Sequence, residues 1–458
     1  MRSYFSGLPT ISIVLAAGLG QSLVAQPRYI LHDLGLGFTT GINAGGQVTG
    51  SFQGANGQPH GFRTAPNSPI NLATDDLGGL TCTAPSQVST NPCPFSRAYA
   101  INDFGNVAGQ SAIQFSFLDQ NLVPIIAHAF RTSSNSKINP ATDDLAGGAF
   151  SMALGINNSG QLVGLFTSAS GNGHAFRMAP NHTAINPATD DLGTLGGFTS
   201  SARGINSIGQ AVGFSQLLSL GFNHGFRTAP NGLINPVTDD LGSLGGSNSD
   251  AMGINDSGQV VGNSGLCEPA PPCSTHAFRT APNSAINPAT DDLGTLGGLT
   301  SSAAAINNAG DAVGVSDTIT GDIHAFVHIG GKLYDLNDLI QQNSGTMLFS
   351  ATGINDRGQI AGYGSVGNDL HAFRLDPATP ADVVSELFNE VGSLGLPRGI
   401  LTVLDAKLDA ARDLLARGNN RAARDQIVAF EDIVTALRRR KLTDAQADTL
   451  LSLAALAF

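Results

Sequence analysis

Tryptophan is absent from this chain of 458 residues, and charged residues make up only 13% of it. Long helices rely on Ala, Leu, Glu and Lys, so scarce charge together with 57 glycines favours short strands separated by turns. The length exceeds that of a typical single domain. We therefore expect either two domains or one large repeat array.

Short catalytic motifs are also missing. The sequence contains no nucleophile elbow, P-loop or HExxH motif. No CxxC spacing is present, so a zinc site would need ligands brought together from distant parts of the chain. The sequence thus assigns no catalytic residue, no cofactor and no metal site.

Basic residues are scarce where the chain is most repetitive. Residues 27–376 carry 12 Lys and Arg against 24 Asp and Glu, whereas residues 377–458 carry 10 against 11. An acidic region with scattered arginines repels a phosphate backbone. Nucleic acid is therefore excluded as an expected partner.

The N-terminal 25 residues predict a signal peptide. Arg2 gives a short basic start, residues 8–19 are mostly apolar, and Ala25 closes a stretch of small residues where a signal peptidase can cut. The apolar run is short and interrupted for a membrane span, although an uncleaved anchor is the alternative. We expect a monomer that is secreted, extracellular or at the cell surface, with no membrane span after cleavage.

Only four cysteines are present, and they form two local pairs inside Pro-rich loops. Export places them in an oxidising compartment, where such pairs close disulfides. The expected disulfides are Cys82–Cys93 and Cys267–Cys273.

Three motifs recur seven times each within residues 27–376. The motif Asn-x-x-Gly-x-x-x-Gly begins at Asn43, Asn102, Asn157, Asn206, Asn255, Asn307 and Asn355. His-Ala/Gly-Phe begins at His60, His128, His174, His224, His276, His324 and His371. The Asp-Leu dipeptide that closes each unit begins at Asp33, Asp76, Asp144, Asp191, Asp240, Asp292 and Asp335.

Each repeat predicts four short strands. The first two, S-x-A-x-G-I-N and the segment after it, flank a tight turn, because Asn bonds to nearby backbone and Gly supplies a positive φ. HAFRTA predicts a third strand and AINPATDDL a fourth. Four strands in about 50 residues are typical of a β-propeller blade, with a β-solenoid or a pair of sandwiches as alternatives.

The Asp-Leu motif is out of phase with the other two. Its first copy, Asp33, precedes the first Asn motif, and none follows His371. The strand over residues 29–34 can therefore complete the last blade and remove two free edges. The predicted fold is an all-β repeat region, a seven-bladed β-propeller closed by the N-terminal strand, followed by a small all-α C-terminal domain.

Helical periodicity begins after residue 377. Leucines from Leu401 to Leu415 form one stripe, Gly418 ends that helix, and residues 443–446 predict a capping box. We expect a linker with a short helix over residues 377–398 and a helical domain over residues 399–458.

The motifs HAFRT, GINxxGQVVG and DLGTLGG resemble the HAF family of probable extracellular repeats over residues 27–376. Gly61, Gly225 and Val327 depart from the pattern. The resemblance implies an extracellular bacterial protein with a propeller-like repeat, and it brings no established catalytic residues. Through AKL, RGN and LTDAQAD, residues 399–457 resemble the FIMAH domain, a helical module at the C-termini of exported bacterial proteins.

The repeated polar residues predict scaffold contacts. A histidine in every repeat would build seven equivalent sites, so we expect it to hold the blade together. Acid pairs such as Asp291–Asp292 predict bonds to turn amides, with Ca²⁺ binding as the alternative. The arginines after Phe are expected to pair with these aspartates.

The copies differ most in the connections expected at one rim. The irregular segments are residues 81–96, 110–127, 217–223 and 267–273. The predicted binding residues there are Phe115, Phe117, Leu118, Asp119, Leu217, Leu218 and Phe222. Exposed loops also vary neutrally, which is the alternative.

The leading hypothesis is an exported, non-catalytic propeller that binds a protein or glycan through this loop-bearing rim, with the tail as an attachment module. An extracellular polysaccharide hydrolase or lyase is the alternative, with acids at the channel mouth. These acids are Asp103, Asp250, Asp317 and Asp322, and two of them beside a His in one pocket would favour the enzyme. A structural surface-layer component is a third possibility.

Overall fold

The computed structural model describes residues 28–458, apart from residues 56, 83–94, 119–120, 219–220, 267–273 and 341–344, and it leaves out the side chains of residues 116–125. The chain divides into two compact units, a β-unit over Arg28–Ala378 and a helical unit over Thr379–Phe458. The expected signal peptide lies outside the described residues. Each unit is considered by itself.

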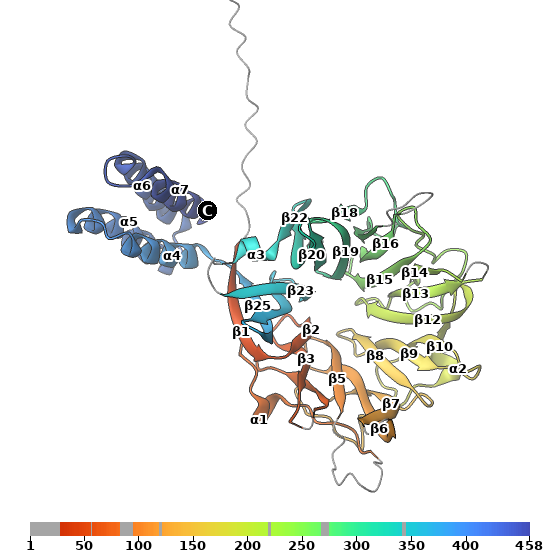
Figure 1. Ribbon diagram of the computed structural model, residues 1–458. Coiled ribbons are helices and arrows are strands. Elements are labelled where there is room, and N and C mark those ends of the chain that lie inside the picture. Colours follow the sequence, from red (N-terminus) through yellow and green to blue (C-terminus); the bar gives the residue numbers. More distant parts are fainter. Residues whose placement is uncertain are drawn as a thin grey trace, which may run out of the picture. The chain divides into compact units, whose positions relative to one another are not determined.

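The β-unit consists mostly of small antiparallel sheets made from consecutive strands (Figure 1). Two of them are joined into one larger sheet by a single parallel pair, Thr275 with Thr300. The first six sets of strands are β2 (Phe38–Ile42), β3 (Val48–Gln53) and β4 (Pro59–Arg63); β5 (Ser96–Ile101), β6 (Val107–Leu118) and β7 (Asn121–Arg131); β8 (Ser151–Ile156), β9 (Leu162–Thr167), β10 (Gly173–Met178) and β11 (Asp191–Gly193); β12 (Gly196–Ile205), β13 (Ala211–Leu217) and β14 (Asn223–Arg227); β15 (Ser249–Ile254), β16 (Val260–Gly265), β17 (Thr275–Arg279) and β18 (Asp292–Gly294); β19 (Gly297–Ile306), β20 (Ala312–Thr318), β21 (Ile323–Ile329) and β22 (Lys332–Asp335).

The last sheet joins the two ends of the β-unit. Its order is β1-β25-β24-β23, with β23 at Thr346–Ile354, β24 at Ile360–Val366, β25 at Asp369–Pro377 and β1 at Tyr29–Leu36. The antiparallel register runs from Tyr29 opposite Pro377 to Leu36 opposite His371. The pairing of the N-terminal strand with the last repeat, predicted from the phase of the Asp-Leu motif, is confirmed.

Steric constraints explain why two positions of the Asn motif are glycine rather than a residue with a side chain. Gly258 has φ +78, which a residue with a side chain rarely adopts, and it forms the turn between β15 and β16. A Cβ on Gly262 would lie 1.9 Å from the carbonyl oxygen of Asp250 on the paired strand. The motif therefore fixes a hairpin whose two strands approach very closely.

Separate hydrophobic cores fill the spaces between consecutive sheets. One core combines Leu77 and Leu80 with Ala98, Phe130 and Ile138, residues of two successive repeats. At the centre of each core lies the Phe of a His-Ala/Gly-Phe motif, and all seven are fully buried: Phe62, Phe130, Phe176, Phe226, Phe278, Phe326 and Phe373. Burial of a Phe side chain contributes about 1.5–3 kcal/mol, so these residues hold neighbouring sheets together.

A serine in the first strand of a repeat also joins it to the preceding one. Ser200 Oγ accepts a hydrogen bond from the backbone N of Ala175 at 2.9 Å and donates to the carbonyl of Gly193 at 2.6 Å. The equivalent serines Ser96, Ser151, Ser249 and Ser301 make the same pair of bonds.

The fourth strand is shorter than AINPATDDL predicts. In two repeats the middle of this segment is a helical turn, α1 (Leu72–Asp75) or α2 (Pro187–Asp190), because an Asn side chain caps it and its last carboxylate accepts from the Asn backbone N–H. Only the Asp-Leu-Gly end pairs with the third strand, as in β11 and β18, or as a single bridge such as Phe62–Asp76. A regular fourth strand occurs in β22, which leads into α3 (Leu336–Leu339).

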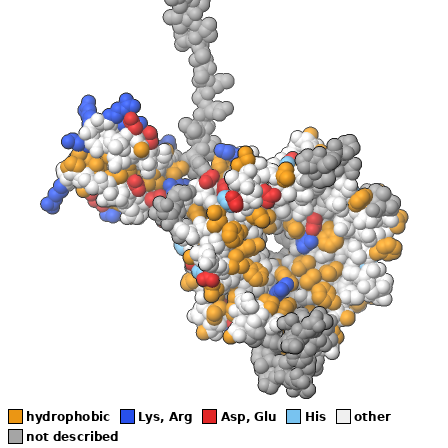
Figure 2. All heavy atoms as spheres, in the orientation of Figure 1, with side chains coloured by type: hydrophobic (Ala, Val, Ile, Leu, Met, Phe, Trp, Pro, Cys, Tyr) orange, Lys and Arg blue, Asp and Glu red, His pale blue; other side chains and the backbone are white. Residues whose placement is uncertain are grey.

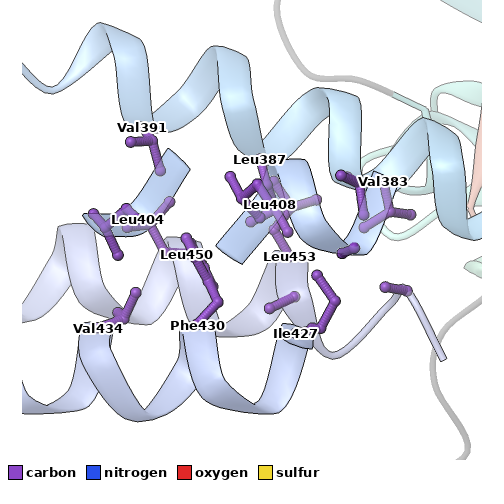
Figure 3. Close-up of a cluster of buried hydrophobic side chains, with 14 of the residues drawn as sticks. Val383, Leu387, Val391, Leu404, Leu408, Ile427, Phe430, Val434, Leu450 and Leu453 are labelled. Carbon is purple, nitrogen blue, oxygen red and sulfur yellow. The ribbon is translucent and has the colours of Figure 1, made fainter. Parts of the chain in front are cut away.

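The helical unit has four helices around one core (Figure 3). They are α4 (Pro380–Ser393), α5 (Arg398–Ala416), α6 (Asn420–Leu437) and α7 (Asp444–Ala454). The predicted stop at Gly418, with φ +73, and the predicted capping box between Thr443 and Gln446 are confirmed. Among the described helices, none is long and apolar enough to cross a membrane.

Residues 377–398, expected to be a linker with a short helix, do contain that helix, and α4 fills most of the segment. This helix buries Val383, Leu387 and Val391 in the same core as Phe430 (Figure 3). Its capping box, in which Thr379 and Asp382 satisfy each other's backbone N–H groups, fixes the start of the helix. The helical unit therefore begins at Thr379.

Candidate functional site in the channel and at its rim

Seven asparagines, one from each Asn motif, link the described repeats into a closed cycle. Asn43 Nδ2 donates to the carbonyl of Asn102 at 3.0 Å, and Asn355 Nδ2 donates to the carbonyl of Asn43 at 2.9 Å. The five other links have lengths of 3.0–3.4 Å, and each joins one asparagine to the next in the order Asn102, Asn157, Asn206, Asn255, Asn307 and Asn355. The hairpins that carry these residues therefore surround one central axis.

The first strands of the repeats line a central channel. A cavity of about 210 Å³ lies at the asparagine end and is lined by the Ile-Asn-x segments, from Ile42 to Asp356. A second cavity of about 330 Å³ is lined by the segments just before them, from Thr40 to Ile354. Figure 2 shows an opening at the centre of the β-unit with hydrophobic side chains gathered around it.

The wall of the larger cavity is chemically uneven. One position, three residues before the Asn of the motif, carries a different side chain in nearly every repeat. It is occupied by Thr40, Tyr99, Leu154, Arg203, Met252, Ala304 and Thr352. The next two positions are Gly or Ala and then Ile in every repeat. The symmetry of the scaffold therefore breaks where side chains face the channel.

A half-buried ion pair lies beside this wall. Arg203 donates from Nε and Nη2 to the two carboxylate oxygens of Asp250 at 3.1 and 2.8 Å, and its guanidinium lies 5.3 Å from the ring centre of Phe214. Burial raises the pKa of the Asp250 carboxyl above its ordinary value, and Arg203 opposes only part of that rise. This bidentate pair joins β12 to β15.

Tyr99 is the aromatic side chain of the wall. Burial raises the pKa of its hydroxyl, and Arg97 opposes part of the rise through its charge and a hydrogen bond. The phenol is therefore a neutral hydrogen-bonding group near pH 7.

The asparagine end of the channel is acidic. Asp103, Asp256 and Asp356 line the smaller cavity, and each accepts a backbone N–H from the preceding repeat. Asn158 and Asn308 lie between them and donate to their carboxylates. The carboxylates are thus tied into the scaffold at this mouth.

The four acids considered for catalysis lie in different places. Asp103 lines the asparagine mouth and Asp250 pairs with Arg203. Asp317 accepts from Thr300 Oγ1 at 2.6 Å, and Asp322 accepts from Thr320 Oγ1 at 2.8 Å in the turn after β20. Neither cavity of the channel, as lined by described residues, brings two of these acids together with a histidine.

The repeated histidines each pair with the aspartate of an Asp-Leu motif. In the described chain the seven Nδ1–carboxylate distances are 2.5–3.0 Å, in the pairs His60–Asp76, His128–Asp144, His174–Asp191, His224–Asp240, His276–Asp292, His324–Asp335 and His371–Asp33. Each of these aspartates also accepts a backbone N–H two residues further on, as Asp76 does from Gly78. The predicted scaffold contacts of histidine and of the acid pairs are both present.

Three of these aspartates have a lowered pKa. Burial by itself would raise the pKa of Asp76, Asp144 and Asp240, but the hydrogen bond from the paired histidine and the bond from the turn amide outweigh it. The ionised carboxylate is therefore the form that the fold stabilises.

The arginines after Phe do not pair with the aspartates as predicted. Arg63 donates from Nη1 to the carbonyls of Gly105 and Ser136 in the next repeat, at 3.2 and 2.9 Å. Arg131, Arg177, Arg227 and Arg279 reach the corresponding carbonyls of their own next repeats. In the last sheet Arg374 instead pairs with Asp376. The arginines bond to backbone carbonyls rather than to the aspartates because their long side chains extend across the gap to the next sheet, where these carbonyls lie.

The predicted rim residues have different environments. Phe115 is only 3% exposed and packs with Phe95 and Ala112, so its expected role at the surface is wrong. The reason is that residues 110–127 extend the β6–β7 hairpin instead of forming a loop. The side chains of Phe117 and Leu118, and all of Asp119, lie outside the described residues.

The predicted residues of the fourth repeat do reach the surface. Leu218 is 80% exposed, Phe222 is also exposed, and Leu217 is half-buried against the adjacent core. Cys82 is not a free thiol, whereas Cys93, Cys267 and Cys273 lie outside the described residues, so the two disulfides stay predictions.

Further exposed hydrophobic residues lie at the starts of first and third strands, in the connections that precede them and, in the case of Leu36, at the end of β1. Because consecutive strands are antiparallel, all these connections lie at one end of the sheets. We call the following residues the apolar rim: Leu36, Phe150, Phe198, Leu218, Phe222, Leu299, Ile319, Ile323, Met347 and Leu370. For Phe198 and Leu299 the sequence contained a signal in GGF and GGL, which follow the DLG segments after two intervening residues.

Neither the family models nor the curated proteins compared with this chain match it. The resemblances of the repeats and of the tail to known families therefore stay predictions.

Proposed function

We propose that the β-unit is a seven-bladed β-propeller and that the protein is an exported, non-catalytic binding module for a protein or glycan. The closed cycle of asparagines and the pairing of β1 with β25 support the propeller. The apolar start of the sequence and the two local cysteine pairs support export.

The apolar rim is the observation that carries the binding role. Isolated exposed hydrophobics are ordinary on a protein surface, but ten gathered at one end of the sheets mark an interaction face. In the described β-unit the remaining exposed large hydrophobics are fewer and lie in connections at the other end of the sheets: Leu72, Phe104, Ile208, Leu233 and Val237. Phe, Met and aliphatic side chains favour a protein over a glycan as the partner, because interface cores are apolar.

Both chain connections of the β-unit leave from the other end of the sheets. The backbone N of Ala378 donates to the carbonyl of Arg28 at 2.9 Å, where β1 begins and β25 ends. The apolar rim lies at the opposite ends of these strands, where Leu36 and Leu370 are found. Attachment through either terminus would therefore leave the rim accessible.

A binding screen with matched variants tests this function. The full chain would be measured by interferometry against cell-surface proteins and glycans, together with a variant carrying Phe198→Asp and Leu218→Asp. We expect the rim variant to bind the identified partner at least tenfold more weakly, a loss of about 1.4 kcal/mol. The control is Val237→Asp, which places the same charge on a residue that is 89% exposed but lies off the rim.

Two results would contradict the proposal. One is equal binding by the rim variant and the control. The other is the absence of any partner together with activity on a panel of polysaccharides, which would favour the hydrolase or lyase.

A further inference from the structure

The channel contains a cavity that shares no lining residue with the apolar rim. The larger cavity has a volume of about 330 Å³, within the range of about 300–1,000 Å³ found for small-molecule pockets. Among the residues that line it, Arg203 is the charged one. Its carboxylate partner Asp250 is not among the lining residues, so the wall presents one cationic hydrogen-bond donor, which favours an anionic group on a ligand.

The guanidinium of Arg203 is held in place before any ligand arrives. Nε and Nη2 are engaged by Asp250, and the ring of Phe214 lies close to the guanidinium. The third nitrogen, Nη1, makes no hydrogen bond to any residue that the structure describes. The Arg203 side chain is 33% exposed, so this donor is not sealed inside the protein. A fixed donor loses little freedom when it binds an anion.

The rest of the wall is divided by chemistry. Leu154 and Met252 come from the sheets on either side of the one that carries Arg203, and Ala304 follows in the next repeat. Thr352 comes from the sheet that joins the two ends of the β-unit, and Thr40 and Tyr99 come from the first and second repeats. An apolar surface flanks the cation, and hydroxyl groups occupy the remaining arc.

We propose that the channel binds a small carboxylate with an apolar body. The carboxylate would accept a hydrogen bond from Arg203 Nη1, and the body would pack against Leu154 and Met252. Binding of such a ligand would account for the variation at this position. Seven identical residues could not supply a cation, an apolar surface and hydroxyl groups in one ring. If the Arg203–Asp250 pair served only to join β12 to β15, a carboxylate would not bind there.

Benzoate is a suitable probe, and benzamide is its neutral counterpart of nearly the same shape. Calorimetric titration of the full chain should show benzoate binding with a dissociation constant below about 10 mM, and benzamide at least about tenfold weaker, because charge-assisted hydrogen bonds to Arg are the stronger ones. No saturation with benzoate, or equal binding of benzamide, would overturn the proposal.

Variants then locate the site. The double change Arg203→Gln with Asp250→Asn removes both charges together, because Arg203→Gln alone would leave a buried carboxylate without its partner. We expect it to abolish benzoate binding. Arg357→Gln, in the turn after Asn355 and outside the lining of the cavity, is the control and should bind as the unchanged protein does.

A second variant guards against misfolding of the first. Ala304→Tyr would fill the cavity without altering the ion pair, and the backbone tolerates Tyr there because Tyr99 occupies the same position in another repeat. Unchanged benzoate binding in Ala304→Tyr would place the ligand elsewhere and refute the site. The rim variant Phe198→Asp with Leu218→Asp should bind benzoate normally, so failure of the rim function and failure of the channel site are separately visible.

Discussion

His371 Nδ1 lies 2.8 Å from Oδ1 of Asp33, a residue 338 positions earlier in the chain. In the six other His–Asp pairs of the described chain the partners are only 11–17 positions apart. The long-range pair has the geometry of the local ones, so the two ends of the β-unit together complete one ordinary repeat.

Deleting residues 28–36 should therefore open the β-unit. Without β1, the outer edge of β25 would expose unpaired backbone groups, and edges of this kind promote association between molecules. We expect the shortened protein to be oligomeric by light scattering after gel filtration. Deletion of residues 1–27 alone is the control, and an equally monomeric product from both deletions would contradict the closure.

Acid should destabilise the β-unit through the His–Asp pairs. A carboxylate whose pKa is lower in the folded state stabilises that state above its unfolded pKa, and this stability is lost as the pH falls through the folded pKa. For Asp76, Asp144 and Asp240 the loss should thus begin near the ordinary value of 3.8 and continue below it. Melting temperatures across this range should fall less steeply when all three are changed to Asn.

Asn255→Ala should cost more stability than its small change in volume suggests. Asn255 Nδ2 donates to the carbonyl of Asn307, and its Oδ1 accepts from the backbone N of Gln259. Truncation leaves these backbone groups unpaired, at about 1–3 kcal/mol for each buried group. Urea denaturation should show the loss, whereas Asn181→Ala, at an exposed turn, should change the unfolding free energy by less than about 0.5 kcal/mol.

Phe430→Ala should unfold or strongly weaken the helical unit. Phe430 is fully buried at the centre of the helical core, and such truncations cost about 3–5 kcal/mol. Because nearly all helix of the described chain lies in this unit, circular dichroism at helical wavelengths reports on it within the intact protein. Val428→Ala, on an exposed face of the same helix, is the control, and equal effects of both changes would contradict the assigned core.

Spacing and phase in the sequence were enough to predict the hairpins at each Asn motif and the pairing of β1 with β25, because both depend on local turn chemistry repeated seven times. Other features depend on which of two local structures is more stable, and the spacing of residues in the sequence does not show this. In AINPATDDL, the capping Asn and the carboxylate that accepts its N–H favour a helical turn over an extended strand. Phe115 becomes buried because β6 and β7 extend together beyond the repeat.

The candidate site was predicted only in part. Leu218 and Phe222 were found because their segment interrupts the repeat, whereas Phe198 and Leu299 belong to the repeat itself and looked like scaffold. Arg203 was missed for a different reason. It lies between the small residues Ala202 and Gly204, and only the structure shows that its position faces a cavity.

The adjacency of Arg28 and Ala378 also determines how the β-unit would respond to mechanical force. Both residues lie at the same end of the β1–β25 ladder, so tension applied between the two chain ends would load the hydrogen bonds from Tyr29 to Leu36 one after another. Sequential loading of this kind unzips a ladder at a much lower force than shear, which loads all its bonds at once. A tether through both ends would thus make β1 the first element to yield, and a tether through one end alone would spare it.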